Sequence, residues 1–573
     1  MDLRIGLVFL LLMSFWAAGR DIDAAQRGVK PGETSDCGPA LRALLEEAAR
    51  EPGCRVVLQP GCYHLYADSA PRRRLFISNH DQPSEHAVGL ELCGAEGASL
   101  VGEGAELVFH GCMLGVLVQD SRDVRLEGLR LRYALPAECE GVITDISERG
   151  TVLRMLSDRA AWTVKDGAFF NCGSGIPLRV RAAFAFLPDG RVVPTGKAGD
   201  IAWSARAEQT DAEHVRFAMD ARTAGLHPGH VVVLRDYARP HPVVMLYRAE
   251  NIRLHRVVIH DSQGMGLLAQ RSRDIHLSGG GCLRLPGRMH TTSADATHFS
   301  NCAGHISVQG ATFESMMDDA INVHSTCLQI AELLSPTRFV ARYAHPQAIG
   351  FETFLPGERV QFIRAATLEN IPPIGRVRRA EFRSPELVEI ETEQPLPEGI
   401  GPGDALENAD YYPSVDFSHC IVRHNRARGA LFTTPAPVTV RNNLFDWCSG
   451  SAILLAGDAQ GWFESGRCLD VRIENNVFDH ALTNLYQFTE AVISVYPMVG
   501  KPTEQREPYH RGIRITGNTF RTHRVPLLFA TSAEDITFRG NRVEYDDAAP
   551  PQQDGRPFIL RHCGAVDSEQ PAP

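Results

Sequence analysis

The 573-residue sequence has no excess of positive charge, no paired cysteine motif and no long hydrophobic run beyond its N-terminus. A net charge of −11 leaves no electrostatic footprint for nucleic acid or for anionic membranes, so we expect no nucleic acid partner. The 14 cysteines are scattered without CxxC spacing, which disfavours a structural zinc site. Helical patterns are also few, which turns attention to β structure.

The N-terminus carries the single apolar run, from Ile5 to Trp16, directly after Arg4. Small residues at 17–19 would suit cleavage before Arg20, so residues 1–19 are predicted to be a secretory signal peptide. We therefore expect an exported protein, periplasmic or secreted, with no membrane insertion once the signal is removed.

The cysteines fall into two groups in such an oxidising compartment. Cys37, Cys54 and Cys62 cluster near the N-terminus, where a disulfide could form among them. The other group lies within or beside repeated strand segments and is expected to fill the core as small buried residues: Cys282, Cys302, Cys420 and Cys448.

A short segment of the form hydrophobic-x-hydrophobic-x-(Asn/Gly)-x-x-hydrophobic recurs along the chain. Copies begin at Val124, Ile252, Ile275, Ile306, Val415, Val438, Val471, Ile513 and Ile536. A spacing of 23 residues recurs, for example from 252 to 275 and from 513 to 536. This alternation with Asn and Gly at the bends predicts an all-β fold, a right-handed parallel β-helix of the pectin-lyase-like type. A β-sandwich would also have many short strands, but not this fixed period.

Two intervals between copies are far longer, 128 residues from Val124 to Ile252 and 109 residues from Ile306 to Val415. Both have dense β patterning and predict inserted small β-barrels or β-sandwiches, at 135–245 and 326–408. An amphipathic helix at Asp36–Arg50, with its apolar stripe from Ala40 to Ala48, is expected to cap the open end of the solenoid. The remaining segments are a cap with the first coils (20–134), central coils (246–325), C-terminal coils (409–563) and a tail (564–573).

Two acidic motifs occupy the same place in consecutive copies of the repeat, SADATH ending at His298 and MDDAINVH ending at His324. Asp295 precedes Asp319 by 24 residues, about one coil, and Asp318 is adjacent. Because stacked coils lie about 4.8 Å apart, the three carboxylates are expected to converge. Such a cluster suits glycoside hydrolysis, which needs a proton donor and a base or nucleophile about 5–9.5 Å apart. We interpret Asp295 as the general acid and the Asp318/Asp319 pair as the group that activates water.

Three polar side chains follow these carboxylates along the same strands: His298, Asn322 and His324. Strand alternation predicts that they face outward beside the carboxylates, where they would bind sugar hydroxyls. A structural histidine or an asparagine ladder is an equal alternative for each of them.

The string ADATHFSNCAGHISVQGATFESMMDDAINVHST resembles the signature of glycoside hydrolase family 110, inverting exo-α-1,3-galactosidases that act on blood group B and related galactosyl glycans. The likeness extends over most of the chain, with the signal peptide, helical cap, β-helix and two β-rich insertions in the same order. By this resemblance Asp295, Asp318 and Asp319 are the active-site carboxylates, the substrate is a galactosyl oligosaccharide or glycoconjugate, and neither metal nor cofactor is expected.

Other functions remain open at this point. Polygalacturonase-like hydrolases share the fold, but this chain lacks their Asn-Thr-Asp element and their RIK element. A polysaccharide lyase would need a basic residue or calcium, and the three carboxylates could themselves bind Ca²⁺. A non-catalytic glycan-binding solenoid would fit the repeat, although it has no need for converging carboxylates. The sequence is compatible with an oligomer.

Overall fold

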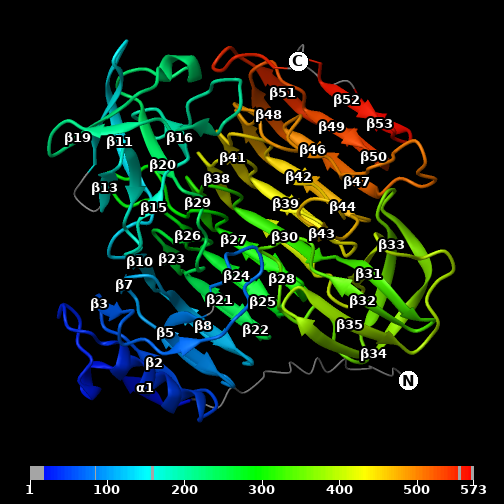
Figure 1. Cartoon of the computed structure of the whole chain (residues 1–573), viewed down its shortest axis with the longest axis horizontal. Coiled ribbons are helices and arrows are strands. Elements are labelled where there is room, and N and C mark those ends of the chain that lie inside the picture. Colours follow the sequence, from blue (N-terminus) through cyan, green and yellow to red (C-terminus); the bar gives the residue numbers. More distant parts are fainter. Residues whose placement is uncertain (1–18, 84, 157–160, 553–555, 570–573) are drawn as a thin grey trace, which may run out of the picture.

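The computed structural model describes residues 19–83, 85–156, 161–552 and 556–569, so the expected signal peptide lies almost entirely outside the described residues. Three parallel sheets run the length of the molecule, and the chain passes from one to the next on every coil (Figure 1). This topology confirms the predicted parallel β-helix.

The strands of the three sheets are as follows. The first sheet contains β1 (Asp21–Asp23), β2 (Arg55–Val57), β6 (Ser99–Val101), β9 (Arg125–Glu127), β22 (Glu250–His255), β25 (Arg273–Ser278), β28 (Ala303–Gln309), β37 (Ser414–Ser418), β40 (Val438–Arg441), β44 (Val471–Glu474), β47 (His510–Thr516), β50 (Ala533–Arg539) and β53 (Val566–Ser568). The second contains β3 (Gly61–Tyr66), β7 (Ala105–His110), β10 (Arg130–Tyr133), β23 (Val258–Ile259), β26 (Gly281–Cys282), β29 (Thr312–Glu314), β38 (Ile421–Arg423), β41 (Leu444–Asp446), β45 (Val477–Asp479), β48 (Thr519–Thr522) and β51 (Arg542–Tyr545). The third contains β4 (Arg72–Arg73), β5 (His86–Cys93), β8 (Leu114–Gln119), β21 (Val244–Tyr247), β24 (Leu267–Gln270), β27 (Thr297–Ser300), β30 (Ile321–Thr326), β39 (Ala430–Phe432), β42 (Ile453–Leu455), β46 (Ile493–Val495), β49 (Leu528–Thr531) and β52 (Phe558–Arg561), with β43 (Glu464–Ser465) paired to β30.

The repeats stack in the register that the sequence predicts. Ile275 pairs with Ile252 on one side and with Ile306 on the other, and Ile306 pairs with Val415 across the second insertion. Because equivalent apolar residues lie above one another, they form one continuous buried core. The Asn of the repeat forms a ladder at the bends, in which each buried Asn donates to the Oδ1 of the next, as from Asn443 to Asn476 at 3.0 Å.

The first insertion is an antiparallel sheet of seven strands beside a smaller sheet of three. Its elements are β11 (Cys139–Ser147), β12 (Gly150–Met155), β13 (Trp162–Lys165), β14 (Ala168–Asn171), β15 (Leu178–Arg179), β16 (Ala182–Phe186), β17 (Ile201–Ala202), β18 (Ala207–Gln209), β19 (His214–Phe217), the 3₁₀ turn η2 (Ala221–Ala224) and β20 (Val231–Arg235). These strands form open sheets, not a closed barrel.

The second insertion is a closed antiparallel barrel. Its strands are β31 (Leu328–Ser335), β32 (Arg338–Arg342), β33 (Arg359–Arg364), β34 (Glu369–Ser384), β35 (Leu387–Thr392) and β36 (Ala405–Asn408). In Figure 1 the two insertions lie on opposite sides of the strands that run from β24 to β39.

The ends of the solenoid differ slightly from the expectation. Helix α1 (Gly38–Ala49), preceded in the chain by the 3₁₀ turn η1 (Ala25–Arg27), covers the first coils and buries Leu41, Leu44, Leu45 and Ala48, whereas Ala40 is exposed. At the other end, β53 extends the first sheet within the segment expected to be a tail, because it pairs in register with β50.

None of the 14 cysteines, all of which lie in described residues, forms a disulfide. The bridge considered among Cys37, Cys54 and Cys62 is therefore absent, whereas Cys282, Cys302, Cys420 and Cys448 are buried in the core as predicted. Within the described ranges, no helix is long and apolar enough to cross a membrane.

Candidate active site

The structure brings the three aspartates together at the bends that precede β27 and β30. Thr297 pairs with Ile321, which places Asp295 one coil from Asp319, and the backbone N–H of Ala296 donates to the Asp319 carbonyl at 2.8 Å. One carboxylate oxygen from each of Asp295, Asp318 and Asp319 lies within 4.8 Å of the others. This convergence follows directly from the stacking of two consecutive coils.

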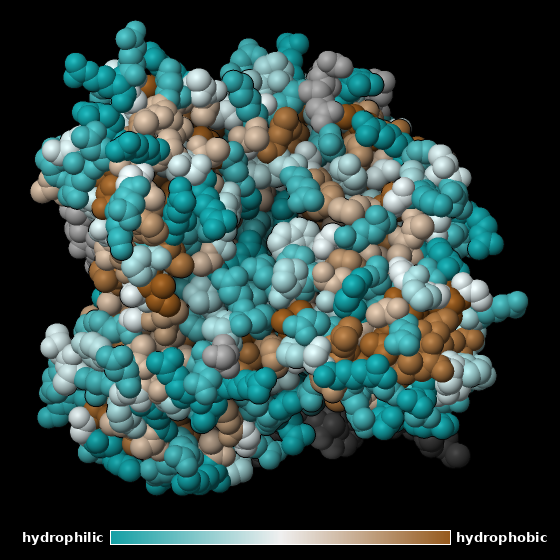
Figure 2. Space-filling view, in the orientation of Figure 1, coloured by the Kyte–Doolittle hydropathy of each residue, from teal (hydrophilic) through white to brown (hydrophobic). Residues whose placement is uncertain are grey.

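These bends open into a cavity of about 460 Å³ on the face shown in Figure 2, where hydrophilic residues dominate the middle of the surface. Asp295, Asp318, His298 and Asn322 line it, together with residues from both insertions. Asp200 and Arg235 come from the first insertion, and Gln347 comes from the loop after β32 of the barrel. The cavity is thus a pocket with walls on several sides.

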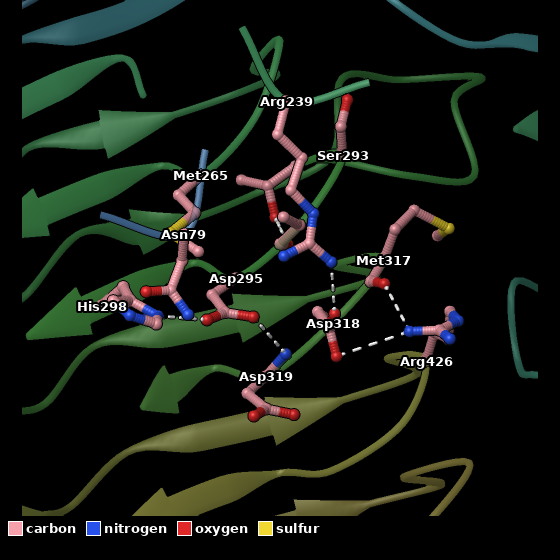
Figure 3. A network of polar contacts seen from close by, with 12 residues as sticks. Asn79, Arg239, Met265, Ser293, Asp295, His298, Met317, Asp318, Asp319 and Arg426 are labelled. Atoms are coloured by element: carbon pink, nitrogen blue, oxygen red, sulfur yellow. Dashed lines mark hydrogen bonds and ion pairs between the residues drawn. The ribbon is translucent and has the colours of Figure 1, made fainter. Parts of the chain in front are cut away.

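Asp295 is the carboxyl group whose environment favours protonation. Its Oδ1 accepts the backbone N–H of Asp319 at 3.1 Å, and its Oδ2 lies 2.6 Å from Nδ1 of His298 (Figure 3). Burial, followed by the negative charge of Asp318, raises the pKa of Asp295 to about 7. At neutral pH this group can therefore hold a proton.

Asp318 is held in the opposite state. Burial alone would favour its neutral form, but Arg426, Arg428 and Arg239 outweigh burial and lower the pKa of Asp318 to about 2. Arg239 donates to Oδ2 at 3.0 Å, and Arg426 approaches Oδ1 at 3.4 Å (Figure 3). Within the described chain Oδ1 is buried and has no hydrogen-bond partner. The ionised carboxylate lines the cavity, where it can accept a proton.

Asp319 lies deeper than the sequence suggested. Its carboxylate does not line the cavity, is fully buried and points away from the other two in Figure 3. Arg428 pairs with it at 3.0 Å and also lies 3.8 Å from Asp318. Burial, Asp318 and Asp295 raise the pKa of Asp319 despite Arg428. Asp319 is therefore placed to support Arg428 instead of meeting water directly.

The three residues expected to bind sugar occupy two different layers. His298 and Asn322 pair side by side on β27 and β30 and line the cavity, and the buried Oδ1 of Asn322 has no partner in the described residues. His324 is not among the residues that line the cavity, because its ring packs behind His298 with the Nε2 atoms 2.8 Å apart, and its contact with the sugar stays a prediction. Strand alternation gave the correct face but not this second layer.

Sequence reasoning missed the arginines. Pairing of Ile321 with Ala430 places Arg428 at the same bend position as Asp319, one coil further on, so extending the repeat alignment across the second insertion could have found it. Arg239 lies in the segment that returns from the first insertion, where no repeat pattern marks it.

Sequence reasoning also missed Glu464 as a residue of the site. It lines the cavity, accepts from Nδ2 of Asn79 at 2.9 Å and lies 3.6 Å from Nε2 of His324. It lies on β43, a short strand between repeats that pairs antiparallel with β30 and has no periodic signal.

Two groups of side chains are compact enough to be considered as metal sites. One is the three aspartates, and the other is His298 with His324 and Glu464. Within each group, one potential ligand atom per residue lies within 4.8 Å of the others. The aspartates already face three arginines, whereas Ca²⁺ requires six to eight oxygen ligands. The histidines are close because they are hydrogen-bonded to each other. Neither group is assigned a metal.

The first insertion is anchored to the segment that carries Asp295. Ser293 donates to Glu138 at 2.6 Å, and Nδ1 of His290 lies 2.5 Å from the fully buried Glu140. Truncating one partner of such a buried charged pair is costly. These contacts therefore fix the bend of Asp295 relative to the wall that supplies Arg235.

Comparison with known proteins agrees with this architecture. The family model for the GLAA-B beta-barrel domain II matches residues 338–406, within the second insertion. The chain is 42% identical to "Alpha-1,3-galactosidase B" of Akkermansia muciniphila over 96% of its own length and 69% of that protein. It is 38% identical to "Alpha-1,3-galactosidase B" of Parabacteroides distasonis, over 92% of this chain and 89% of that protein. Among solved structures, the family 28 exopolygalacturonase of Yersinia enterocolitica aligns with a TM-score of 0.41 and 11% identity, over 97% of this chain and 79% of the other. On its similarity to the two galactosidases the chain belongs to their family, glycoside hydrolase family 110, as its acidic motifs predicted.

Proposed function

We propose that this protein is an exported, exo-acting α-1,3-galactosidase that hydrolyses terminal α-1,3-linked galactose with inversion of configuration. The observation that carries the proposal is the pairing of two carboxyl groups with opposite pKa shifts in one cavity, about 7 for Asp295 and about 2 for Asp318. Such a pair is what acid–base hydrolysis of a glycoside requires.

Asp295 acts as the general acid and Asp318 as the general base. As the bond between the anomeric carbon and the glycosidic oxygen breaks, Asp295 gives its proton to that oxygen. A water molecule attacks the anomeric carbon and loses a proton to the carboxylate of Asp318, which lines the cavity. The products are free galactose and the shortened glycan, and the proton gained by Asp318 restores the balance.

The stereochemical part of the proposal comes from the family resemblance. The nearest carboxylate oxygens of Asp295 and Asp318 are within 4.8 Å, whereas inverting enzymes usually separate their carboxyl groups by about 6.5–9.5 Å and retaining enzymes by about 5–5.5 Å. Spacing alone would therefore suit a direct attack by Asp318 as well. The anomer released first distinguishes the two mechanisms.

A neutral sugar fits the charges of the cavity. Arg235, Arg239, Arg426 and Arg428 each pair with an aspartate in the described structure. Because these arginines already pair with aspartates, they are poorly placed to form a further ion pair with a uronate carboxylate. Walls from both insertions favour the end of a glycan over its middle, which supports exo action on galactosyl chains such as the blood group B antigen.

The test is hydrolysis of a linear α-1,3-galactosyl oligosaccharide and of its fucosylated, blood group B-type counterpart, followed by NMR. We expect release of galactose alone, first as the β-anomer. First appearance of the α-anomer would refute inversion, and release of larger fragments would refute exo action. Lack of galactose release from both substrates would refute the galactosidase proposal itself.

A further inference from the structure

A chain of hydrogen bonds leads from Asp295 into the protein. Oδ2 of Asp295 lies 2.6 Å from Nδ1 of His298, Nε2 of His298 lies 2.8 Å from Nε2 of His324, and Nδ1 of His324 lies 2.9 Å from the carbonyl oxygen of Ser325. Both imidazole side chains are only 1% exposed. The chain therefore ends on a backbone oxygen away from solvent.

The last contact fixes the direction of all the others. A carbonyl oxygen can only accept, so Nδ1 of His324 carries hydrogen and, in the neutral ring, Nε2 is an acceptor. Nε2 of His298 must then donate to His324, which leaves Nδ1 of His298 as an acceptor. With both rings neutral, the proton between His298 and Asp295 belongs to Asp295.

We propose that His298 and His324 are positioning residues that hold the acidic proton on Oδ2 of Asp295 until it passes to the leaving oxygen, a role that rests on the proposed hydrolysis. If Asp295 lost its proton first, its charge would face the lone pair of His298. Turning His298 into the other tautomer would relieve this, but it would break the bond to His324. Ionisation of Asp295 thus costs a buried hydrogen bond.

The surrounding charges act on the same group. The charge of Asp318 favours the protonated form of Asp295, whereas Arg239, Arg428 and the backbone N–H of Asp319 oppose it. His80, in the β4–β5 loop, faces His298 but is neutral, since burial lowers its pKa to about 3. Glu464 lies 3.6 Å from Nε2 of His324, beyond hydrogen-bond distance. The groups that face the chain are Asp318, Asp319, Arg239, Arg428, His80 and Glu464.

The first test reads the tautomers without measuring activity. The full-length wild-type protein, labelled with ¹⁵N-histidine, is observed by NMR at pH 6, with His298→Asn and His324→Gln used to assign the two rings. We expect His324 to be the Nδ1–H tautomer and His298 the Nε2–H tautomer. A His298 ring that carries hydrogen on Nδ1, whether neutral or charged, would overturn the proposal.

The second test uses the pH dependence of kcat/KM for the α-1,3-galactosyl substrate. A glutamine amide can either donate to or accept from His298, so His324→Gln frees the tautomer while keeping a polar partner, and His324 does not line the cavity. We expect the alkaline limb to move down by about one pH unit, with KM little changed. A purely structural role would lower kcat at all pH values or the melting temperature, and would leave the limb in place.

His276→Gln is the matched control, because His276 lies on β25 in the first sheet and does not line the cavity. Its profile should match that of the wild type. An active His324→Gln enzyme with an unshifted limb would overturn the role of the histidines but not the proposed function. A wild-type protein that releases no galactose would refute the function, while the tautomers would still test the hydrogen-bond chain.

Discussion

Arg428 occupies, one coil beyond Asp319, the bend position that Asp319 occupies one coil beyond Asp295. Asp295, Asp319 and Arg428 thus lie in one column of the solenoid, and Arg428 pairs with Asp319 at 3.0 Å. The repeat therefore places the counter-charge of the site as well as its carboxylates.

Replacing Arg428 should damage both activity and stability. Arg428→Met would leave the fully buried Asp319 without its partner; because the pKa of Asp319 is raised, this carboxyl can take up a proton, and the cost should fall below the roughly 3–5 kcal/mol of an unpaired buried charge. We expect a lower melting temperature and a kcat reduced at least tenfold, because Asp318 also loses a neighbouring positive charge. Arg441→Met removes a partly exposed pair with Asp416 and should change neither quantity measurably. Equal behaviour of the two variants would contradict the buried pairing.

The roles of Asp295 and Asp318 can be separated by the leaving group. Asp295→Asn and Asp318→Asn should each lower kcat on the oligosaccharide by about 10²–10⁴. On an aryl α-galactoside with an acidic phenol, Asp295→Asn should recover most of its activity, since that leaving group needs no proton. Asp318→Asn should stay impaired on both substrates. The reverse pattern would exchange the two assignments.

The pH dependence of kcat/KM should follow the two carboxyl groups. Activity requires protonated Asp295, whose pKa is about 7, and ionised Asp318, whose pKa is about 2. We expect a broad maximum between these values and a tenfold fall per pH unit above about 7. Initial rates in overlapping buffers measure it. A profile that keeps rising above pH 8 would exclude Asp295 as the acid.

The free energy of unfolding should also depend on the protonation of Asp295. Because the pKa of Asp295 is raised in the folded protein, its proton stabilises the fold at low pH, and this contribution is lost as pH rises through about 7. An asparagine side chain resembles the protonated acid, so Asp295→Asn should match wild type only near pH 4, where the carboxyl is largely protonated in the unfolded chain too, and be more stable by roughly 4 kcal/mol at pH 8. Thermal unfolding at both pH values measures this, and equal stability at pH 8 would contradict the raised pKa.

Much of this arrangement was predictable because it repeats. The apolar periodicity placed Ile275, Ile306 and Val415 in one stack, and the same period brought Asp295 next to Asp319. What could not be predicted comes from outside the period. Arg239 follows the first insertion, and Glu464 lies on the short strand β43, which pairs antiparallel with β30 outside the repeat.

The histidines show a second limit. Alternation correctly placed both His298 and His324 on the outer face of their strands, but it contains no information about which ring covers the other. That order depends on the terminal hydrogen bond to the carbonyl of Ser325, which fixes His324 in the deeper layer. A local backbone contact, which the residue pattern does not reveal, thus helps to decide which of the two rings lies at the cavity.

Tyr237 is expected to contact the substrate beyond the terminal galactose. It lines the cavity, its side chain is 43% exposed, and its backbone has a φ of 70°, a strained conformation for an aromatic residue. The guanidinium of Arg235 lies over one face of the ring, 4.9 Å from the centroid, which leaves the other face for the apolar side of a sugar. Tyr237→Ala should raise KM about tenfold and leave kcat nearly unchanged, because the proposed proton transfers involve Asp295 and Asp318. Tyr545→Ala is the matched control, since Tyr545 is 49% exposed but does not line the cavity. Comparison of the aryl α-galactoside with the oligosaccharide measures the effect: a KM that rises equally for both substrates would place the ring against the galactose instead.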